Sequence, residues 1–471
     1  MARILIVFLL FLLGPLALAQ SVVETRHDSG ALKERFEVDA QGRKHGKYEA
    51  FREDGTRLQT AVYRTDRLHG LSVEFDSAER PRLEALYASG ERSGQWREYD
   101  KGVLRLAATY ANDMLEGSWA RYDEEGRPVA RGSYKRGAVN GRYVELRPVD
   151  AWESSVEYRA GVLHGKGTIT VAGKLASKRK WDEGRLVELD GCVPFPIARE
   201  ALEAELAAAR VAPAGNATDP ISDDRQFALA RLRTYRALCG LPWRHIRLVP
   251  KWNELCDAAA EICAAHGKLD HTPPKPAGFD DERYRQGYEG ASKSNLFGGG
   301  LRGSVDAYMD DSDPSNIDRI GHRRWCLNPT MGATGFGASG RWTAMWAMDS
   351  SGPSPQGLDA VFYPARGYVP VDLFGPRHAW SIQLLSGAPP RDASAFDVVV
   401  QRLDEHFQAT GEPLALDWKN LGGGGFGGGA CLVFRPVGVE VAPGARYRVQ
   451  VRETKTKVAR FDYVVEFCAS N

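Results

Sequence analysis

A repeat of about 24 residues constrains the fold of this sequence more than any other feature. Glycine recurs at positions 46, 70, 94, 117, 141 and 165, and a tyrosine stands seven residues before each of the last five glycines. Aromatic residues also recur two and five residues after these glycines, as Trp96 and Tyr99 do after the third. A fixed short period of this kind predicts a repeat architecture.

Each repeat unit is expected to form a β-hairpin, with pairs such as His69-Gly70 at the turn and the aromatic residues on one buried face. Because a single hairpin cannot bury its face, the units are expected to stack into an elongated all-β array over residues 40–187. The pattern resembles MORN repeats. This resemblance implies a scaffold or interaction surface whose recurring aromatic residues serve mainly as core.

The N-terminus has the pattern of a secretory signal peptide. Arg3 supplies a positive charge, residues 4–18 are almost wholly apolar, and Ala17-Leu18-Ala19 is a small-residue cleavage site. We expect residues 1–19 to be removed, the protein to be secreted or to reside in the periplasm or cell envelope, and no transmembrane span to remain. With 62 basic and 61 acidic residues, the chain has no general attraction for nucleic acid.

A second region, residues 197–350, combines helical patterns with two histidines. Helices are expected over 197–211, 222–240 and 251–266, the last stopped by Gly267. His271 and His322 then flank a polar, glycine-rich segment, which must fold back on itself to be compact. That folding would bring both imidazoles to one cleft, and two neutral imidazoles can begin a metal site.

The order of motifs over residues 222–350 resembles the CAP superfamily of cysteine-rich secretory, antigen 5 and pathogenesis-related proteins, also called the SCP domain, in its bacterial form. The motifs that carry the resemblance are Tyr235-Arg236, His271-Thr272, Ser294-Asn295-Leu296, Tyr308-Met309, His322-Arg323 and Asn328-Pro329. The resemblance implies an α-β-α sandwich with a cleft between His271 and His322. It also maps an acidic residue of that cleft to Asp311.

The sequence departs from the family pattern at Ser294, which stands where family members have a glutamate. Glu289, five residues earlier, is a candidate substitute, and the neighbouring Asn295 is a further cleft candidate. His271 and His322 are the candidate ligands of a divalent metal such as zinc, although a site short of carboxylates binds metal weakly. Ser294 has no adjacent base in sequence and is not expected to act as a nucleophile.

The C-terminal third is expected to form an immunoglobulin-like β-sandwich over residues 360–471, because short strands alternate with Pro/Gly turns. The glycine-rich run 421–430 lacks the pattern of a phosphate-binding loop and is interpreted as a flexible hairpin connection. Export permits disulfides, and Cys431 with Cys468 is the most economical pair. Cys256 and Cys263, on one expected helix, are too far apart to bridge.

Three functions remain open for this multidomain chain. The first is a module that binds a small ligand, a lipid or a protein partner in the CAP-like cleft. The second is a metal-assisted hydrolase, peptidase-like or esterase-like, in which Asp311 or Glu289 acts as base on a metal-bound water. The third is a structural surface protein with an inactive cleft. Binding is favoured over catalysis, because the sequence lacks the family's glutamate.

Overall fold

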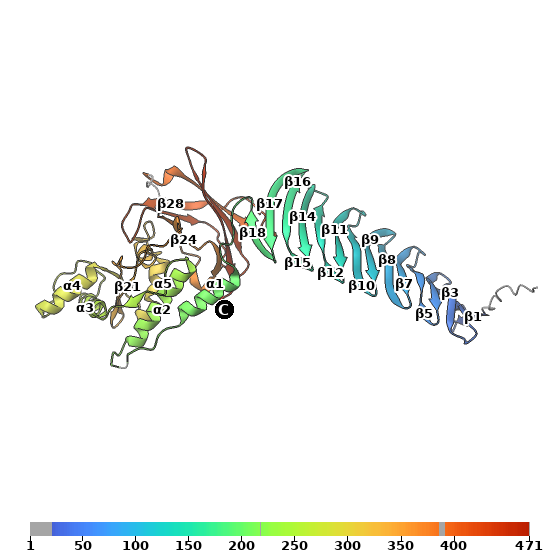
Figure 1. The fold of residues 1–471 in the computed structure, drawn as a ribbon, viewed down its shortest axis with the longest axis horizontal. Coiled ribbons are helices and arrows are strands. Elements are labelled where there is room, and N and C mark those ends of the chain that lie inside the picture. Colours follow the sequence, from blue (N-terminus) through green and yellow to red (C-terminus); the bar gives the residue numbers. More distant parts are fainter. Residues whose placement is uncertain (1–20, 217, 386–390, 471) are drawn as a thin grey trace, which may run out of the picture. The chain divides into compact units, whose positions relative to one another are not determined.

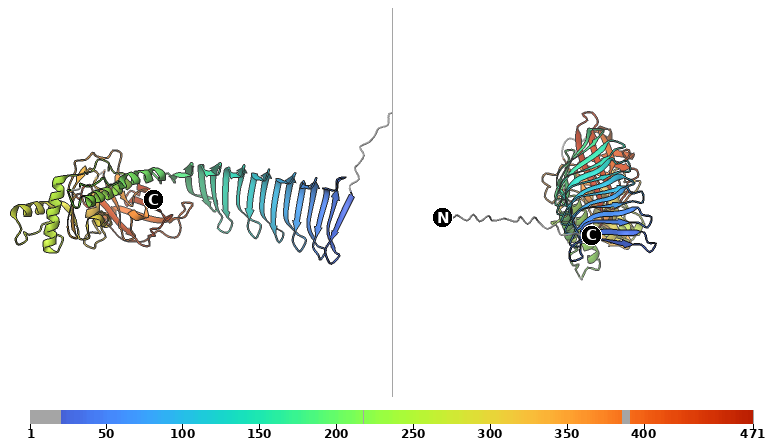
Figure 2. Two further views of the ribbon diagram at one scale, coloured as in Figure 1. Left: turned by 90° about the horizontal axis from the view of Figure 1, so that it is seen from below. Right: turned by 90° about the vertical axis from the view of Figure 1, so that its right-hand side faces the viewer.

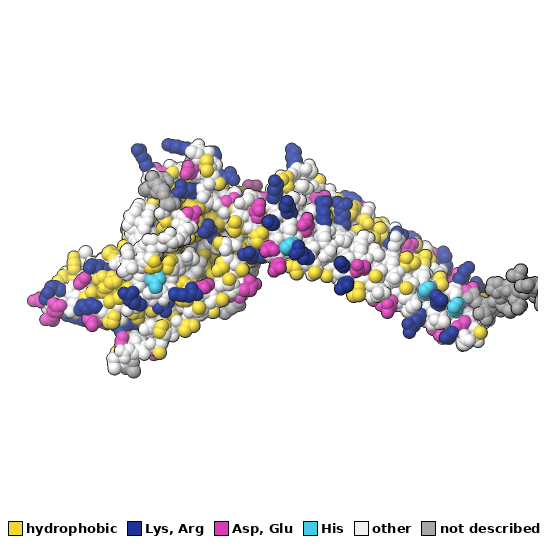
Figure 3. Space-filling view, viewed as in Figure 1, with side chains coloured by type: hydrophobic (Ala, Val, Ile, Leu, Met, Phe, Trp, Pro, Cys, Tyr) yellow, Lys and Arg dark blue, Asp and Glu magenta, His cyan; other side chains and the backbone are white. Residues whose placement is uncertain are grey.

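The computed structural model describes residues 21–216, 218–385 and 391–470, so the predicted signal peptide lies outside the described residues. The chain divides into two compact units, Met1–Gly191 and Cys192–Asn471. The boundary falls where the repeat pattern stops. Basic and acidic side chains are interspersed on the visible face of both units (Figure 3), in keeping with the near-zero net charge.

Within the described residues, the first unit is a single antiparallel sheet of 18 strands, in which the longer strands pair in chain order and three two-residue strands each pair with the strand before them (Figures 1 and 2). The sheet begins at Ser21, well before the expected start near residue 40. Its strands are β1 (Ser21–Arg26), β2 (Leu32–Val38), β3 (Lys44–Phe51), β4 (Arg57–Arg64), β5 (Arg67–Leu68), β6 (Gly70–Phe75), β7 (Pro81–Ala88), β8 (Glu91–Asp100), β9 (Val103–Ala111), β10 (Met114–Tyr122), β11 (Pro128–Lys135), β12 (Ala138–Val139), β13 (Gly141–Arg147), β14 (Trp152–Arg159), β15 (Val162–Leu163), β16 (Gly165–Val171), β17 (Lys174–Asp182) and β18 (Arg185–Leu189).

The recurring glycine belongs to a strand, and its placement at the hairpin turn was wrong. Five of the six repeat glycines lie directly opposite the recurring tyrosine of the next long strand, as Gly46 opposes Tyr63 and Gly94 opposes Tyr110, and the sixth, Gly165, opposes Trp181. A Cβ at Gly94 would lie 2.9 Å from the Leu86 side chain, and the backbone there has a φ of +114°. Both facts favour glycine at this position. The repeat of glycine therefore reflects where neighbouring strands pair, and not where the chain turns.

Aromatic rings line one another along the sheet. Tyr48 packs edge-on against Tyr63 with ring centroids 5.2 Å apart, and Tyr143 packs against Tyr158 at 6.0 Å. Burial raises the pKa of Tyr63 and Tyr158 above the usual range. The aromatic residues thus supply the shared apolar layer that hairpins need in order to stack.

The second unit begins with helices. The three expected helices are present as α1 (Arg199–Arg210), α2 (Ser222–Leu238) and α3 (Pro250–His266), and Gly267 ends α3 with a φ of +64°. Three further helices follow: α4 (Asp281–Ser292), α5 (Leu301–Asp310) and α6 (Gly321–Cys326). A three-stranded antiparallel sheet in the order β20 (Ser294–Phe297), β23 (Trp342–Trp346), β22 (Phe336–Ser339) accompanies them, with a small parallel pair, β19 (Arg247–Leu248) and β21 (Ala333–Thr334).

Two four-stranded sheets complete the second unit. One has the order β24 (Ala360–Tyr363), β26 (Trp380–Leu384), β29 (Cys431–Pro436), β28 (Leu416–Gly422); the other has the order β25 (Gly367–Pro370), β31 (Ala459–Cys468), β30 (Arg446–Glu453), β27 (Phe396–Leu403). Short 3₁₀ turns lie at Val371–Leu373 and Ala393–Ala395. Trp380 of the first sheet packs edge-on against Tyr447 of the second at 6.0 Å, so the two sheets share a core.

The helical region and the C-terminal sheets, predicted as two domains, form one compact unit. A single cluster of buried apolar residues runs through both, from Leu232 and Tyr308 to Trp380 and Phe434. This core does not include a disulfide. Cys431 and Cys468 lie in different sheets and both are free thiols, which corrects the predicted pairing. Among the described residues, no helix has the length and apolar character needed to span a bilayer.

Candidate functional site

The structure places His271 and His322 on one pocket of about 490 Å³ in the second unit. Ser294 and Asn295 also line it, so four of the six residues selected from the sequence meet here. Strand β20 supplies the serine and asparagine, helix α6 supplies His322, and the loop after α3 supplies His271. The remaining two candidates, Asp311 and Glu289, do not line the pocket.

Asp311 lies buried behind His322 and fixes its orientation. Its Oδ1 is 2.9 Å from His322 Nδ1, and its Oδ2 accepts from the backbone N–H of Arg323 at 3.2 Å. The side chain of Asn316 also donates to Oδ1. A carboxylate in this position keeps the imidazole proton on Nδ1. His322 therefore presents Nε2 to the pocket.

The burial of Asp311 corrects its predicted role as a base on water in the cleft. Its side chain is 2% exposed, whereas that of His322 is 31% exposed. Both carboxylate oxygens are already taken by donors from the protein. The residue ends α5 in the left-handed conformation, with a φ of +50°, and this turns its side chain inward. Asp311 can act on a ligand only through His322, as a positioning residue.

His271 is anchored in a comparable way from the other side. Its Nδ1 lies 2.9 Å from the carbonyl oxygen of Ala291. A carbonyl can only accept, so the imidazole proton is again on Nδ1 and the lone pair is on Nε2. The preceding histidine, His266, is hydrogen-bonded to the carbonyl of Pro274 and does not line the pocket.

The other sequence candidates have structural partners. The side chain of Asn295 donates to the carbonyl oxygen of His322 at 3.0 Å and so joins strand β20 to helix α6. Ser294 Oγ lies 3.6 Å from Cys256 Sγ, and among the described residues no hydrogen bond joins it to a histidine or a carboxylate. Burial raises the pKa of Cys256 to about 12, which keeps this thiol protonated. Neither side chain is prepared to act as a nucleophile.

Glu289 does not replace the glutamate missing at Ser294. Its carboxylate pairs with Lys293 at 2.9 Å on the surface of α4, and its side chain is 48% exposed. A helical residue four positions from its partner makes this contact readily. The pocket therefore has no acidic residue in its described lining.

The donors in the pocket do not fit a resident zinc ion. Zinc sites in proteins use three or four ligands, chiefly Cys, His, Asp and Glu. The described part of the chain contains no group of three or more such residues placed to hold a metal. His271 and His322 offer two, and the carboxylate nearest to them, that of Asp311, is turned away.

Sequence reasoning missed the second wall of the pocket, which comes from the glycine-rich run 421–430. Phe426 in this run packs edge-on against Trp325 with ring centroids 6.4 Å apart, and both line the pocket. The run is held in place, because the buried Arg324 donates through Nη2 to the carbonyl oxygens of Gly423, Gly425 and Gly429 at 2.8–3.1 Å. This corrects the interpretation of the run as a flexible connection.

Arg323, next to His322, fixes helix α6 to the C-terminal sheets. It is fully buried and donates to the carbonyl oxygens of Met309 at 2.7 Å and Ala379 at 2.6 Å. Its guanidinium also lies 4.6 Å from the ring centroid of Tyr363. The sequence showed only a His-Arg pair, with no sign of these distant partners. The position of His322 thus depends on both halves of the unit.

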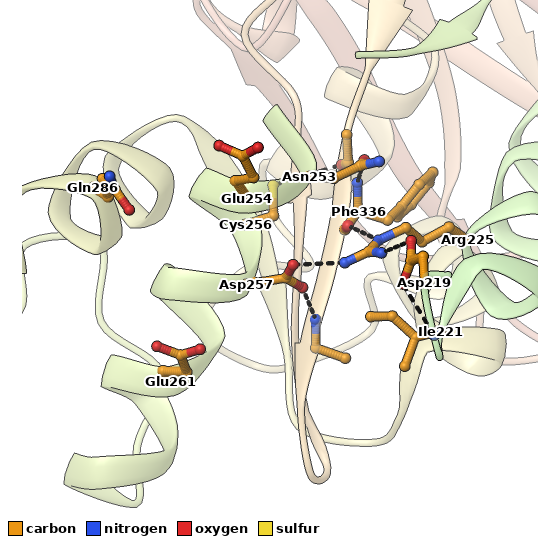
Figure 4. A network of polar contacts seen from close by, with 12 residues as sticks. Asp219, Ile221, Arg225, Asn253, Glu254, Cys256, Asp257, Glu261, Gln286 and Phe336 are labelled. Atoms are coloured by element: carbon orange, nitrogen blue, oxygen red, sulfur yellow. Dashed lines mark hydrogen bonds and ion pairs between the residues drawn. The ribbon is translucent and has the colours of Figure 1, made fainter. Parts of the chain in front are cut away.

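A polar network beside β22 joins helices α2 and α3 (Figure 4). Arg225 of α2 is buried, donates to the carbonyl oxygen of Phe336 at 2.8 Å, and pairs with Asp257 of α3 at 2.6 Å and with Asp219. Asn253 of α3 accepts from the backbone N–H of Phe336 at 2.9 Å. These contacts link α2 and α3 to one another and to the backbone of Phe336, so the network positions α2, α3 and β22.

No family model matches this chain, and no curated protein matches it. What the pocket does must therefore be argued from its residues. They provide two imidazoles with Nδ1 anchored, one arginine at the rim and an aromatic wall.

Proposed function

We propose that this chain is an exported protein of the CAP type whose cleft binds a small ligand between His271 and His322. One observation carries the proposal: two imidazoles from distant parts of the chain line one pocket, each held by a hydrogen bond at Nδ1. Anchored imidazoles lose little freedom when a ligand arrives, and this favours binding. The motif order across residues 222–350 supports the CAP assignment.

In this proposal the other parts of the chain present the cleft. The N-terminal sheet is a MORN-like array that contacts a protein or lipid partner at the cell envelope or outside the cell. The two C-terminal sheets form an immunoglobulin-like sandwich that supports one wall of the cleft. The array is consistent with this role, because its recurring aromatic residues stabilise the stacking of hairpins and leave charged residues on the surface.

A fragment screen by ligand-observed NMR on the full chain tests the proposal. We expect hits that are lost in His322→Ala and His271→Ala. They should be retained in His406→Ala, a control that changes an exposed histidine of the same unit outside the pocket. Hits that persist in both pocket variants would contradict the proposed cleft. A screen without hits would leave a structural surface protein with an inactive cleft.

A second candidate function, hydrolysis of an ester or a peptide, is favoured by the Asp311–His322 pair. A histidine backed by a buried carboxylate can take a proton from water through Nε2. In this mechanism His322 is the base that activates water, and no metal is needed. The sequence had predicted Asp311 or Glu289 as the base on a metal-bound water. Turnover of p-nitrophenyl acetate by the full chain, lost in His322→Ala, is the expected result. A rate equal to that in buffer would exclude this activity for acetate esters.

A further inference from the structure

The glycine-rich run carries one side chain, and the backbone is strained to place it. Residues 422–429 are glycine except for Phe426. Phe426 has a φ of +49°, in the left-handed region that bulky residues rarely adopt. Glycine would adopt this conformation without strain, so the backbone conformation does not explain why position 426 is a phenylalanine. The explanation lies in the contacts of its ring.

The ring of Phe426 lies against the helix that carries His322. A Cβ built on Gly321 would lie 3.0 Å from Phe426 Cε1, so the ring sits directly over the first residue of α6. The guanidinium of Arg324 lies 5.0 Å from the ring centroid on another side. With Trp325, the ring forms an apolar surface beside the residue whose Nε2 faces the pocket.

The one fixed charge in the described lining of the pocket is positive. Arg319 is the one residue of the described lining that carries a fixed charge, and no aspartate or glutamate lines the pocket. Arg319 donates through Nε to Asn316 Oδ1 at 2.8 Å, which orients its guanidinium at the rim. Guanidinium N–H groups are donors that suit a carboxylate, and an imidazole that already donates at Nδ1 donates at Nε2 as well once it takes up a second proton.

We propose that the cleft selects a small carboxylate that bears an aromatic group, and that Phe426 is the specificity-determining residue for that group. The proposal rests on the proposed function and names its ligand class. The carboxylate lies toward Arg319 and the imidazoles, and the aromatic group packs on Phe426 and Trp325. The same chemistry occurs in a free aryl acid and in the C-terminus of a peptide that ends in an aromatic residue.

Calorimetric titration of the full chain tests the ligand class with four probes. We expect 4-phenylbutyrate to bind at least about tenfold more tightly than butyrate, because a buried phenyl group adds apolar contact. 4-Phenylbutylamine, which reverses the charge, should bind at least about tenfold more weakly than 4-phenylbutyrate. N-acetylphenylalanine reports on the peptide source: tighter binding than 4-phenylbutyrate favours a peptide C-terminus, and weaker binding favours a free acid.

Phe426→Gly tests the residue itself. The variant removes the ring and relieves the backbone, so the fold should persist, which a thermal melt checks. We expect the preference for 4-phenylbutyrate over butyrate to fall below about twofold, while Phe426→Leu gives an intermediate value. Phe407→Gly is the matched control, because Phe407 also has a left-handed backbone, with a φ of +59°, but does not line the pocket. It should leave the preference unchanged.

Several results would overturn the inference. One is an unchanged preference in Phe426→Gly; another is equal binding of the amine and the acid. If neither 4-phenylbutyrate nor N-acetylphenylalanine binds, the inference also fails. In that case the fragment screen decides separately whether the cleft binds ligands of another class. Failure of the inference and failure of the proposed function are therefore distinguishable.

Discussion

Replacing Asp311 with asparagine should destabilise the second unit by about 1–3 kcal/mol, because one buried donor loses its partner. Asparagine keeps the shape of the side chain and tolerates the left-handed backbone at this position, where φ is +50°. Its oxygen can replace Oδ1, which accepts from His322 and Asn316. Its NH₂ group then faces the backbone N–H of Arg323, whose partner among the described residues is Oδ2.

The measurement is urea unfolding of the full chain, with the transition of the second unit assigned by hydrogen exchange in α5 and α6. Asp313→Asn is the matched control, since Asp313 is exposed and its side chain accepts from Ser315 nearby. We expect the control to stay within about 0.5 kcal/mol of the parent chain. If Asp311→Asn and Asp313→Asn have the same stability, Asp311 does not hold helix α6 as described.

Three further predictions follow from other contacts. Burial, and then the nearby Arg323, lowers the pKa of His378 to about 3, so the unfolded chain takes up a proton below about pH 6.5 that the folded chain does not. Stability should fall by up to about 1.4 kcal/mol per pH unit as the pH drops through this window, and less steeply in His378→Gln, as urea unfolding at several pH values will show. After unfolding without reductant, a thiol reagent should label both Cys431 and Cys468, whereas loss of both labels would reveal a disulfide between them. Gly290→Ala should destabilise the chain by about 1–3 kcal/mol, because its Cβ would lie 2.1 Å from the carbonyl oxygen of Leu255. Gly303→Ala, with open space around its Cβ, should not lower the melting temperature.

Features that depend on local sequence were predictable. The repeat period indicated a stacked sheet, and the apolar spacing with Gly267 located helix α3 and its end. The two histidines were chosen from motif order, and the structure places both on one pocket. The prediction that the repeat glycines lie at hairpin turns was wrong, because the period shows that a glycine recurs but not where in the hairpin it lies. Its partner, the tyrosine of the next strand, is set by pairing.

Features that depend on distant contacts were not predictable. Nothing near Arg324 in the sequence indicates that it binds three glycine carbonyls about a hundred residues away, in the run that carries Phe426. Asp311 stands in a run of acidic residues that resembles a solvated surface. It is buried because a left-handed turn ends α5 there and brings it to His322.

The central claim is that His271 and His322 face one cleft with Nε2 available to a ligand. Nitrogen NMR of the full chain with ¹⁵N-labelled histidine tests it most directly, with signals assigned by the two alanine variants. At saturating ligand, taken from the fragment screen or the carboxylate series, the account predicts that both Nε2 signals shift together while that of His406 does not. A ligand that shifts only one of the two signals, or neither, would contradict it.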